Sequence, residues 1–192
     1  MTSRAHRGNV TGSGNNVEIP RNPLNQLQPY QQVCMGVGTV CGLRTPTSSQ
    51  GGVADCWDMR NRSGFLTSPT ERFEQLACGQ SFTVGLTSNG TVVCWGTQAA
   101  CGAPAGRRFQ QISAYARICG ITDTYQTLCW SPFSPELSLP LNPYSDFANA
   151  EVMQICSGRF VDCAVRTDYS IFCYGDPAVS YTHLTLPTNR EV

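Results

Sequence analysis

Cysteine is the residue type with the most chemical potential in this sequence, which holds 11 cysteines among 192 residues. Such a density is uncommon in reduced cytosolic proteins and is typical of chains that form disulfides in an oxidising compartment. Zinc sites usually use close pairs such as C-x-x-C, and the sequence contains none. Histidine adds few ligands, because only His6 and His183 are present. We therefore expect disulfides, with no metal site and no cofactor.

Two cysteine pairs share one spacing, since Cys119 and Cys129 are ten residues apart, as are Cys163 and Cys173. If each pair lies across a β-hairpin, the loop between its two strands is three residues long. Directly opposed residues of antiparallel strands come close enough for a disulfide. We predict the disulfides Cys119–Cys129 and Cys163–Cys173.

A third pair, Cys41 and Cys56, suits the same bridge around a longer loop. The unit that contains Cys94 has Val84 where the other units have their first cysteine. The partner of Cys94 therefore stays open, with Cys101 as one candidate. An odd total leaves at least one cysteine free or paired outside the chain. The cysteines left without an assigned partner are Cys34, Cys78, Cys94, Cys101 and Cys156.

Hairpins must position these cysteines, and the clearest hairpin signal lies within Phe73–Gly96. This stretch reads FEQLACGQSFTVGLTSNGTVVCWG, with β-prone runs on either side of Ser88-Asn89-Gly90. Asn-Gly between such runs is a strong hairpin signal, because Gly90 can adopt the positive φ that a tight turn needs. We predict one hairpin there, preceded by a short strand at Phe73–Ala77.

The same pattern recurs along the chain. Related units start at Gln31, Phe109 and Val152, and each ends on a cysteine followed by an aromatic residue. A period of roughly 40 residues, with strand pairs and Gly/aromatic punctuation, is typical of propeller blades. We predict an all-β fold, a partial β-propeller of about four blade-like repeats within residues 29–178. The repeats are expected at about 30–63, 73–98, 109–133 and 151–176.

Both ends of the sequence depart from the repeat. Residues 1–28 are polar and lack hydrophobic periodicity, so we expect a disordered segment or linker. They contain no apolar signal-peptide core, which conflicts with an oxidising compartment unless the chain is a fragment of a longer one. Val179–Thr188 resembles a translated transposase-type sequencing adaptor. We interpret residues 179–192 as a non-native tail, with an ordinary polar C-terminal strand as the alternative.

With the units aligned, the pattern F-x-Q-I/L-x-x-G…C-G-I/L…G-x-x-x-C-W-G resembles the regulator of chromosome condensation repeat superfamily. It is more closely similar to the cysteine-bearing version in the ectodomains of plant crinkly-type receptor kinases. The resemblance covers about Tyr30–Asp176 and implies a propeller, usually with seven blades, of which four units would be a fragment. The clearest unit carries it on Phe73, Gln75, Leu76, Gly79, Gly85, Leu86, Gly90, Cys94, Trp95 and Gly96.

The sequence offers no motif for catalysis, because it has no nucleophile elbow, P-loop or kinase signature. We predict no catalytic residues. The aromatic residues that follow the repeat cysteines are interpreted as packing between blades, with an exposed ligand-binding ring as the alternative. Five aspartates are interpreted as turn and surface residues: Asp55, Asp58, Asp123, Asp162 and Asp168.

Three N-x-S/T sequons begin at Asn9, Asn61 and Asn89. Asn89 falls at the predicted hairpin tip, where a glycan fits without burying polar atoms. We predict glycosylation at Asn89 and Asn61, which agrees with passage through the secretory pathway.

We expect an extracellular binding protein with a peptide or protein ligand. Lys+Arg and Asp+Glu balance at 13 each, so there is no basic field to attract nucleic acid. No apolar run is long enough to span a bilayer, and no membrane contact is expected in this segment, although a membrane anchor is expected in the full-length protein. The leading hypothesis is part of the ectodomain of a receptor-like serine/threonine kinase, with any kinase domain outside this chain.

Two alternatives stay open. One is an intracellular propeller of the chromosome-condensation type that binds a small GTPase or chromatin, against which the cysteine pairs and the neutral charge count. The other is a secreted propeller that acts as an enzyme inhibitor.

Overall fold

Four small antiparallel sheets make up the computed structural model, which describes residues 29–46, 51–59, 65–66, 68–96, 102–132 and 151–175. The strand orders are β1-β2-β3-β4, β5-β6-β7, β10-β9-β8 and β11-β12-β13, and we call these sheets blades one to four. The strands are β1 Tyr30–Met35, β2 Thr39–Arg44, β3 Ala54–Asp58, β4 Phe65–Leu66, β5 Gln75–Cys78, β6 Phe82–Leu86, β7 Val92–Gly96, β8 Phe109–Ala114, β9 Ile118–Thr122, β10 Thr127–Trp130, β11 Val152–Ser157, β12 Val161–Arg166 and β13 Ile171–Gly175.

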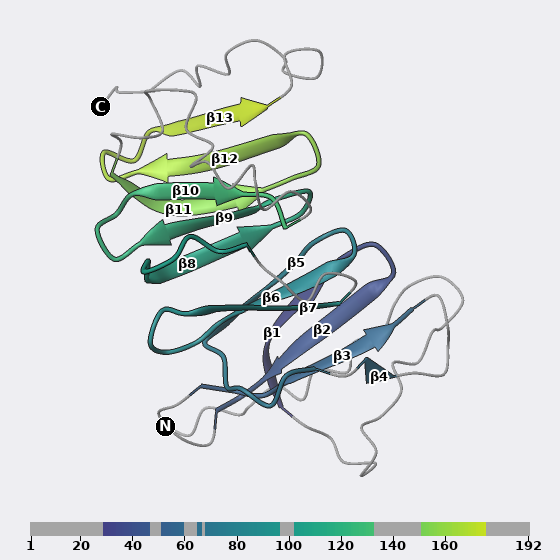
Figure 1. Cartoon of the computed structure of the whole chain (residues 1–192). Coiled ribbons are helices and arrows are strands. Elements are labelled where there is room, and N and C mark those ends of the chain that lie inside the picture. Colours follow the sequence, from purple (N-terminus) through teal and green to yellow (C-terminus); the bar gives the residue numbers. More distant parts are fainter. Residues whose placement is uncertain are drawn as a thin grey trace, which may run out of the picture.

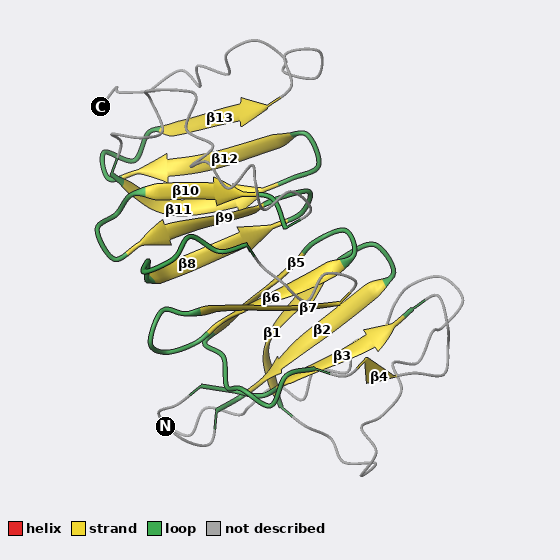
Figure 2. Cartoon of the chain, in the orientation of Figure 1, coloured by secondary structure: helices red, strands yellow, loops and turns green. Residues whose placement is uncertain are grey.

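The blades follow one another in chain order (Figure 1), and the first strands β1, β5, β8 and β11 contact each other in sequence. Figure 2 shows strands joined by loops, with no helix in the described residues. None of the described residues forms a helix that is long and apolar enough to cross a bilayer. The all-β, blade-like prediction is confirmed, whereas the predictions for residues 1–28 and 179–192 lie outside the described residues.

In blades two to four, main-chain bonds at the ends of the second and third strands close three-residue loops at 88–90, 123–125 and 167–169, as the cysteine spacing predicts. In blade two, the Gly90 N–H donates to the Thr87 carbonyl at 2.9 Å, and Gly90 has a φ of 79°. Tyr125 and Tyr169 occupy the same loop position, with φ values of 60° and 67°. This left-handed conformation is free of steric penalty for glycine and uncommon for tyrosine. The repeat therefore imposes the turn on whichever residue stands there.

Side-chain sizes are matched between the first and second strands of each blade. Gly120 lies beneath the Phe109 ring, where an added Cβ would come 2.5 Å from the ring carbon Cδ1. Gly85 stands in the same way beneath Phe73. Blade four has Ala164 at the glycine position and the smaller Val152 at the aromatic position, and both are buried in one cluster. The pair of positions thus conserves volume, as close packing requires.

The hydrophobic core lies between consecutive blades. One cluster joins Leu43 and Ala54 of blade one to Phe73 and Trp95 of blade two, and two similar clusters join blades two to three and three to four. Trp95 stacks on Phe73 with ring centroids 5.3 Å apart. Trp95 and Trp130 belong to clusters that join two blades, so the prediction that the repeat aromatics pack between blades is confirmed for these two residues. Trp57 is also buried, but it packs edge-on against Tyr30 of its own blade.

A glutamine on each first strand clamps the main chain of the next blade. Gln32 donates from Nε2 to the Leu76 carbonyl and accepts the Leu76 N–H at Oε1, both at 2.8 Å. Gln75 makes the same two bonds to Ile112, at 3.0 and 2.8 Å. The third such glutamine, Gln111, accepts the Ile155 N–H at 3.1 Å. Because these main-chain groups are not paired across the joint by strand ladders, the amide side chains satisfy them.

The residue that begins each of blades two to four donates a further main-chain hydrogen bond to a loop of the preceding blade. The Phe73 N–H donates to the Gly52 carbonyl at 2.8 Å, and the Phe109 N–H donates to the Gly90 carbonyl at 2.9 Å. Val152 repeats the contact with the Tyr125 carbonyl at 3.3 Å. Each blade thus binds the next through equivalent atoms, which fixes the register of the array.

Candidate binding face

A hollow opens where the first strands of blades two to four begin. It is an open cleft of about 540 Å³, a size within the range of ligand sites. Amide, acidic, aliphatic, aromatic and thioether side chains share its lining. The lining residues are Glu74, Gln75, Leu86, Gln110, Gln111, Tyr125 and Met153.

Tyr125 is the exposed aromatic residue of this cleft. It sits at a hairpin tip, where its positive φ is held by the bond from its N–H to the Thr122 carbonyl at 3.0 Å. Tyr125 is 49% exposed, and the nearby residue Met153 is 41% exposed. Large amphipathic side chains on rigid tips are typical of protein-binding surfaces. Tyr125 and Met153 therefore form the apolar part of the candidate face.

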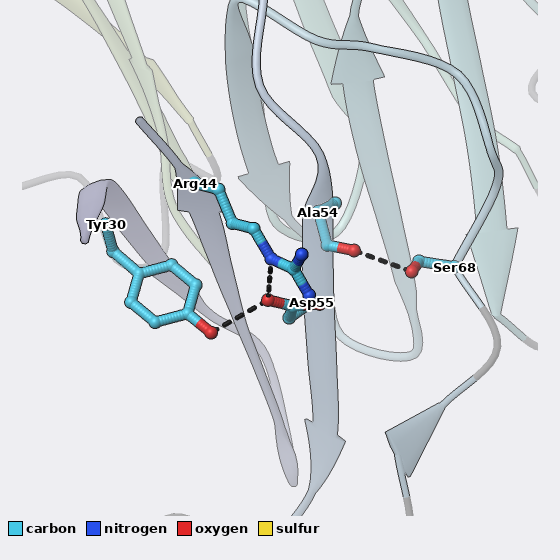
Figure 3. A network of polar contacts seen from close by, with 5 residues as sticks. All are labelled: Tyr30, Arg44, Ala54, Asp55 and Ser68. Carbon is cyan, nitrogen blue, oxygen red and sulfur yellow. Dashed lines mark hydrogen bonds and ion pairs between the residues drawn. The ribbon is translucent and has the colours of Figure 1, made fainter. Parts of the chain in front are cut away.

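A network of polar contacts lies in blade one, at the other end of the array from blade four (Figure 3). Asp55 is buried on β3, and Arg44 holds its carboxylate through two hydrogen bonds of 2.6 Å. The Tyr30 hydroxyl donates to Asp55 Oδ2 at 2.8 Å. Partial burial and this bond to the carboxylate raise the pKa of Tyr30, and the bond to Asp55 raises the pKa of Arg44. With both donors committed, the network is structural.

A second buried carboxylate lies between blades three and four. Asp162 on β12 is 2% exposed and accepts from Arg117 Nε at 2.6 Å. Burial raises the pKa of Asp162, and the Arg117 guanidinium offsets part of that effect. The interpretation of Asp55 and Asp162 as turn or surface residues is thus wrong, because both are buried on strands and paired with arginine. Asp123 and Asp168 do lie in hairpin loops.

The structure contains the three disulfides that the cysteine spacing predicts. Each joins directly opposed residues of one blade, with Cα atoms 4.0 to 4.1 Å apart. Cys94 is also disulfide-bonded, while its candidate partner Cys101 lies outside the described residues. The three bridges are Cys41–Cys56, Cys119–Cys129 and Cys163–Cys173.

A fourth described disulfide joins two blades and was not predicted. Cys34 on β1 is bonded to Cys78 on β5, with Cα atoms 5.5 Å apart. The signal was present in the sequence, because Cys78 stands one repeat position later than Cys34. The glutamine clamps show the same offset, because Gln32 bonds to Leu76, which stands one position after Gln75, the repeat equivalent of Gln32. Among the described cysteines, Cys156 is free and exposed.

Of the two predicted glycosylation sites, Asn61 lies outside the described residues. Asn89 is exposed at its hairpin tip, where its Oδ1 accepts from the Thr87 hydroxyl at 2.6 Å and from the Thr91 N–H at 3.1 Å. No group of three or more potential metal ligands occurs within the described residues.

Residues 73–102 match the family described as the regulator of chromosome condensation (RCC1) repeat. One blade of the chain is thus similar to an RCC1 repeat. The match covers the blade with the Asn-Gly hairpin, and the other three blades share its glutamine clamp position and strand order. No curated protein matches the sequence.

Solved structures show the same fold. The entire ectodomain of the Physcomitrella patens receptor kinase CR4 is 24% identical, with a TM-score of 0.61 over 88% of this chain and 44% of that one. The CRINKLY WD40 ectodomain of the Arabidopsis thaliana receptor kinase ACR4 is 19% identical, with a TM-score of 0.55 over 77% and 50%. Prp20p of Saccharomyces cerevisiae, whose structure was described with its binding to Gsp1p and histones, is 16% identical, with a TM-score of 0.58 over 81% and 45%. The matched region spans about half the length of these structures.

Proposed function

We propose that this chain is part of an extracellular propeller that binds a peptide or protein, as in the ectodomain of a receptor-like serine/threonine kinase. The observation that carries the proposal is the disulfide framework. It staples the hairpins of three blades at one repeat position and crosses one joint between blades. Such a framework is typical of proteins in an oxidising compartment and rare in cytosolic ones.

The similarity to two plant receptor-kinase ectodomains supports this choice. The similarity to Prp20p keeps an intracellular partner-binding propeller as the competing function. In either case the fold acts as a scaffold, and the partner is chosen by side chains on loops and strand ends. We assign that role to the cleft and its Tyr125–Met153 surface.

The location can be tested with antibodies against blades two and three, applied to source cells before and after permeabilisation. Labelling of intact cells, lost after brief external proteolysis, supports the proposal. Labelling that requires permeabilisation and coincides with nuclear DNA contradicts it and favours the intracellular function.

The binding face can be tested by selecting ligands from a displayed random-peptide library against the whole chain. We expect Tyr125→Asn to lower the affinity for the selected peptides at least about tenfold. This is the effect of losing an aromatic contact worth over about 1.4 kcal/mol of binding free energy. Asparagine tolerates the positive φ, so the turn is preserved. Tyr169→Asn is the matched control, because Tyr169 occupies the same loop position in blade four without lining the cleft. Equal loss in both variants contradicts the assignment.

A further inference from the structure

The outward side of blade four repeats the atoms with which each earlier blade holds its successor. Gln154 follows Gln32, Gln75 and Gln111 at the clamp position of the first strand. It is exposed, and its side chain has no hydrogen-bond partner among the described residues. Gln154 is therefore positioned to make the pair of bonds that Gln75 makes to Ile112.

The side chain two residues after the clamp glutamine also reaches the next blade. In blade one this is Cys34, which is bonded to Cys78. In blade three it is Ser113, whose Oγ accepts the Ser157 N–H at 2.7 Å. Cys156 holds this position in blade four, where it is free and exposed.

Residues around Gln154 and Cys156 in blade four are more exposed than their counterparts in blade three, which blade four covers. Thr127 on β10 is 5% exposed beneath blade four, whereas its counterpart Ile171 on β13 is 55% exposed. Cys119 is fully buried in blade three, and its counterpart Cys163 is only half-buried. Tyr169, which corresponds to the Tyr125 that accepts the Val152 N–H, is 80% exposed. This face lies along β11–β13, at one end of the array in Figure 1.

We propose that this face, centred on Gln154 and Cys156, receives the first strand of a fifth repeat unit that carries a cysteine three residues after its own clamp glutamine. That is the position of Cys78 relative to Gln75. Gln154 binds the N–H and carbonyl of the residue after the incoming glutamine, and Cys156 forms a disulfide with the incoming cysteine. The matched solved structures are about twice as long as the region they share with this chain, which leaves room for such units.

A second copy of this chain is the competing occupant, and its chemistry fits less well. Its free first strand would offer Val33 to the clamp, but it has Met35 where the incoming cysteine is required. A head-to-tail pair of copies could therefore form the hydrogen bonds and not the disulfide.

The disulfide forms by exchange with a low-molecular-weight disulfide such as oxidised glutathione. The Cys156 thiolate attacks one glutathione sulfur, which creates a mixed disulfide and releases one glutathione thiolate. The incoming cysteine thiolate then attacks the Cys156 sulfur and releases the second. Two protein thiols are oxidised and one glutathione disulfide is reduced, while the protons lost by the former are taken up by the latter.

A synthetic peptide with the sequence of Phe73–Gly79 is the probe, because this segment already fills the equivalent joint beside Cys34. The whole chain is equilibrated with the peptide in a glutathione buffer, and the mixed disulfides are quantified by mass spectrometry. We expect the peptide at Cys156, favoured about tenfold over the same peptide N-methylated at its leucine, since methylation removes the N–H that the clamp accepts. N-methylation at the peptide's glutamine is the matched control and should have no such effect.

The clamp itself is tested with two variants at an exposed position. Gln154→Ala and the shorter Gln154→Asn should both abolish the preference for the unmethylated peptide. Gln31→Ala, at an exposed glutamine beside the clamp residue of blade one, should retain it. Equal capture of both peptides, or a preference that survives Gln154→Ala, overturns the proposal. A dimer of the chain that excludes the peptide in sedimentation also overturns it and assigns the face to a second copy.

Discussion

Cys34 and Cys78 are bonded across two neighbouring blades, 44 residues apart in the chain. Two residues before Cys34, Gln32 clamps the main chain of Leu76 in the same neighbour. The covalent and polar contacts thus coincide on one joint. At the joint between blades three and four, the hydrogen bond from the Ser157 N–H to Ser113 Oγ takes the place of the disulfide. Contacts between blades therefore add to the stability that the hairpins supply.

Removing one clamp should destabilise the whole array. Gln75→Ala leaves the N–H and carbonyl of the buried Ile112 unpaired, and we expect a loss of about 1–3 kcal/mol in the free energy of unfolding. Gln75→Glu should also lose stability, because a carboxylate still accepts the N–H but cannot donate to the Ile112 carbonyl. Chemical denaturation measures both, with Gln110→Ala as the neutral neighbour. Equal stability of Gln75→Ala and Gln110→Ala would show that the clamp contributes nothing.

The size match between Phe109 and Gly120 predicts a specific rescue. Gly120→Ala places a Cβ 2.5 Å from the Phe109 ring, and overpacking of this kind costs about 1–3 kcal/mol. Combining it with Phe109→Val recreates the Val152–Ala164 pair of blade four. We expect the double variant to lose at least about 0.5 kcal/mol less than the sum of the single variants. Simple additivity in the denaturation curves contradicts the size match.

Asp162 and Asp168 should make opposite contributions to the pH dependence of the free energy of unfolding. Burial raises the pKa of Asp162 above its ordinary 3.8, so its carboxyl favours folding most when protonated. Relative to Asp162→Asn, the natural protein should lose stability as the pH rises from below 3.8 through the raised pKa. Hydrogen bonds from Ser170 lower the pKa of Asp168, so relative to Asp168→Asn stability should fall as the pH drops below 3.8.

Thermal unfolding between about pH 2.5 and 7 measures both differences. Arg117 stays charged throughout this range, so the loss of its ion pair in Asp162→Asn shifts the curve without bending it. Two difference curves of the same sign would contradict the assigned environments.

The hairpin tip at Asn89 should carry an N-linked glycan. Thr91→Ala removes the sequon but keeps the main-chain bonds of Thr91, and Thr91→Ser keeps the sequon. Secretory expression followed by glycosidase treatment and intact-mass measurement should show a glycan-sized shift in the natural chain and in Thr91→Ser. Thr91→Ala should carry one glycan fewer than the natural chain, and an unchanged number of glycans in this variant would contradict modification at Asn89.

Local patterns in the sequence predict the hairpins well and the joints poorly. The spacing of Cys119 and Cys129 identifies opposed strand residues, because a hairpin is a short-range structure whose geometry depends on its loop length. The clamp by Gln75 joins residues 37 apart, so its partner depends on how whole blades are placed. The prediction of a turn or surface role for Asp55 and Asp162 is wrong for the same reason, because their arginine partners become neighbours only in the folded sheets. Cys34 and Cys78 could have been paired only by comparing consecutive repeats.

The state of the cysteines in protein purified from its own cells tests the extracellular assignment most directly. Alkylation of free thiols at harvest, followed by non-reducing peptide mapping, would identify each bridge. We predict Cys34–Cys78, Cys41–Cys56, Cys119–Cys129 and Cys163–Cys173 as disulfides in nearly all molecules. Free, alkylated thiols at Cys119, Cys129, Cys163 and Cys173 would contradict the account and support an intracellular propeller.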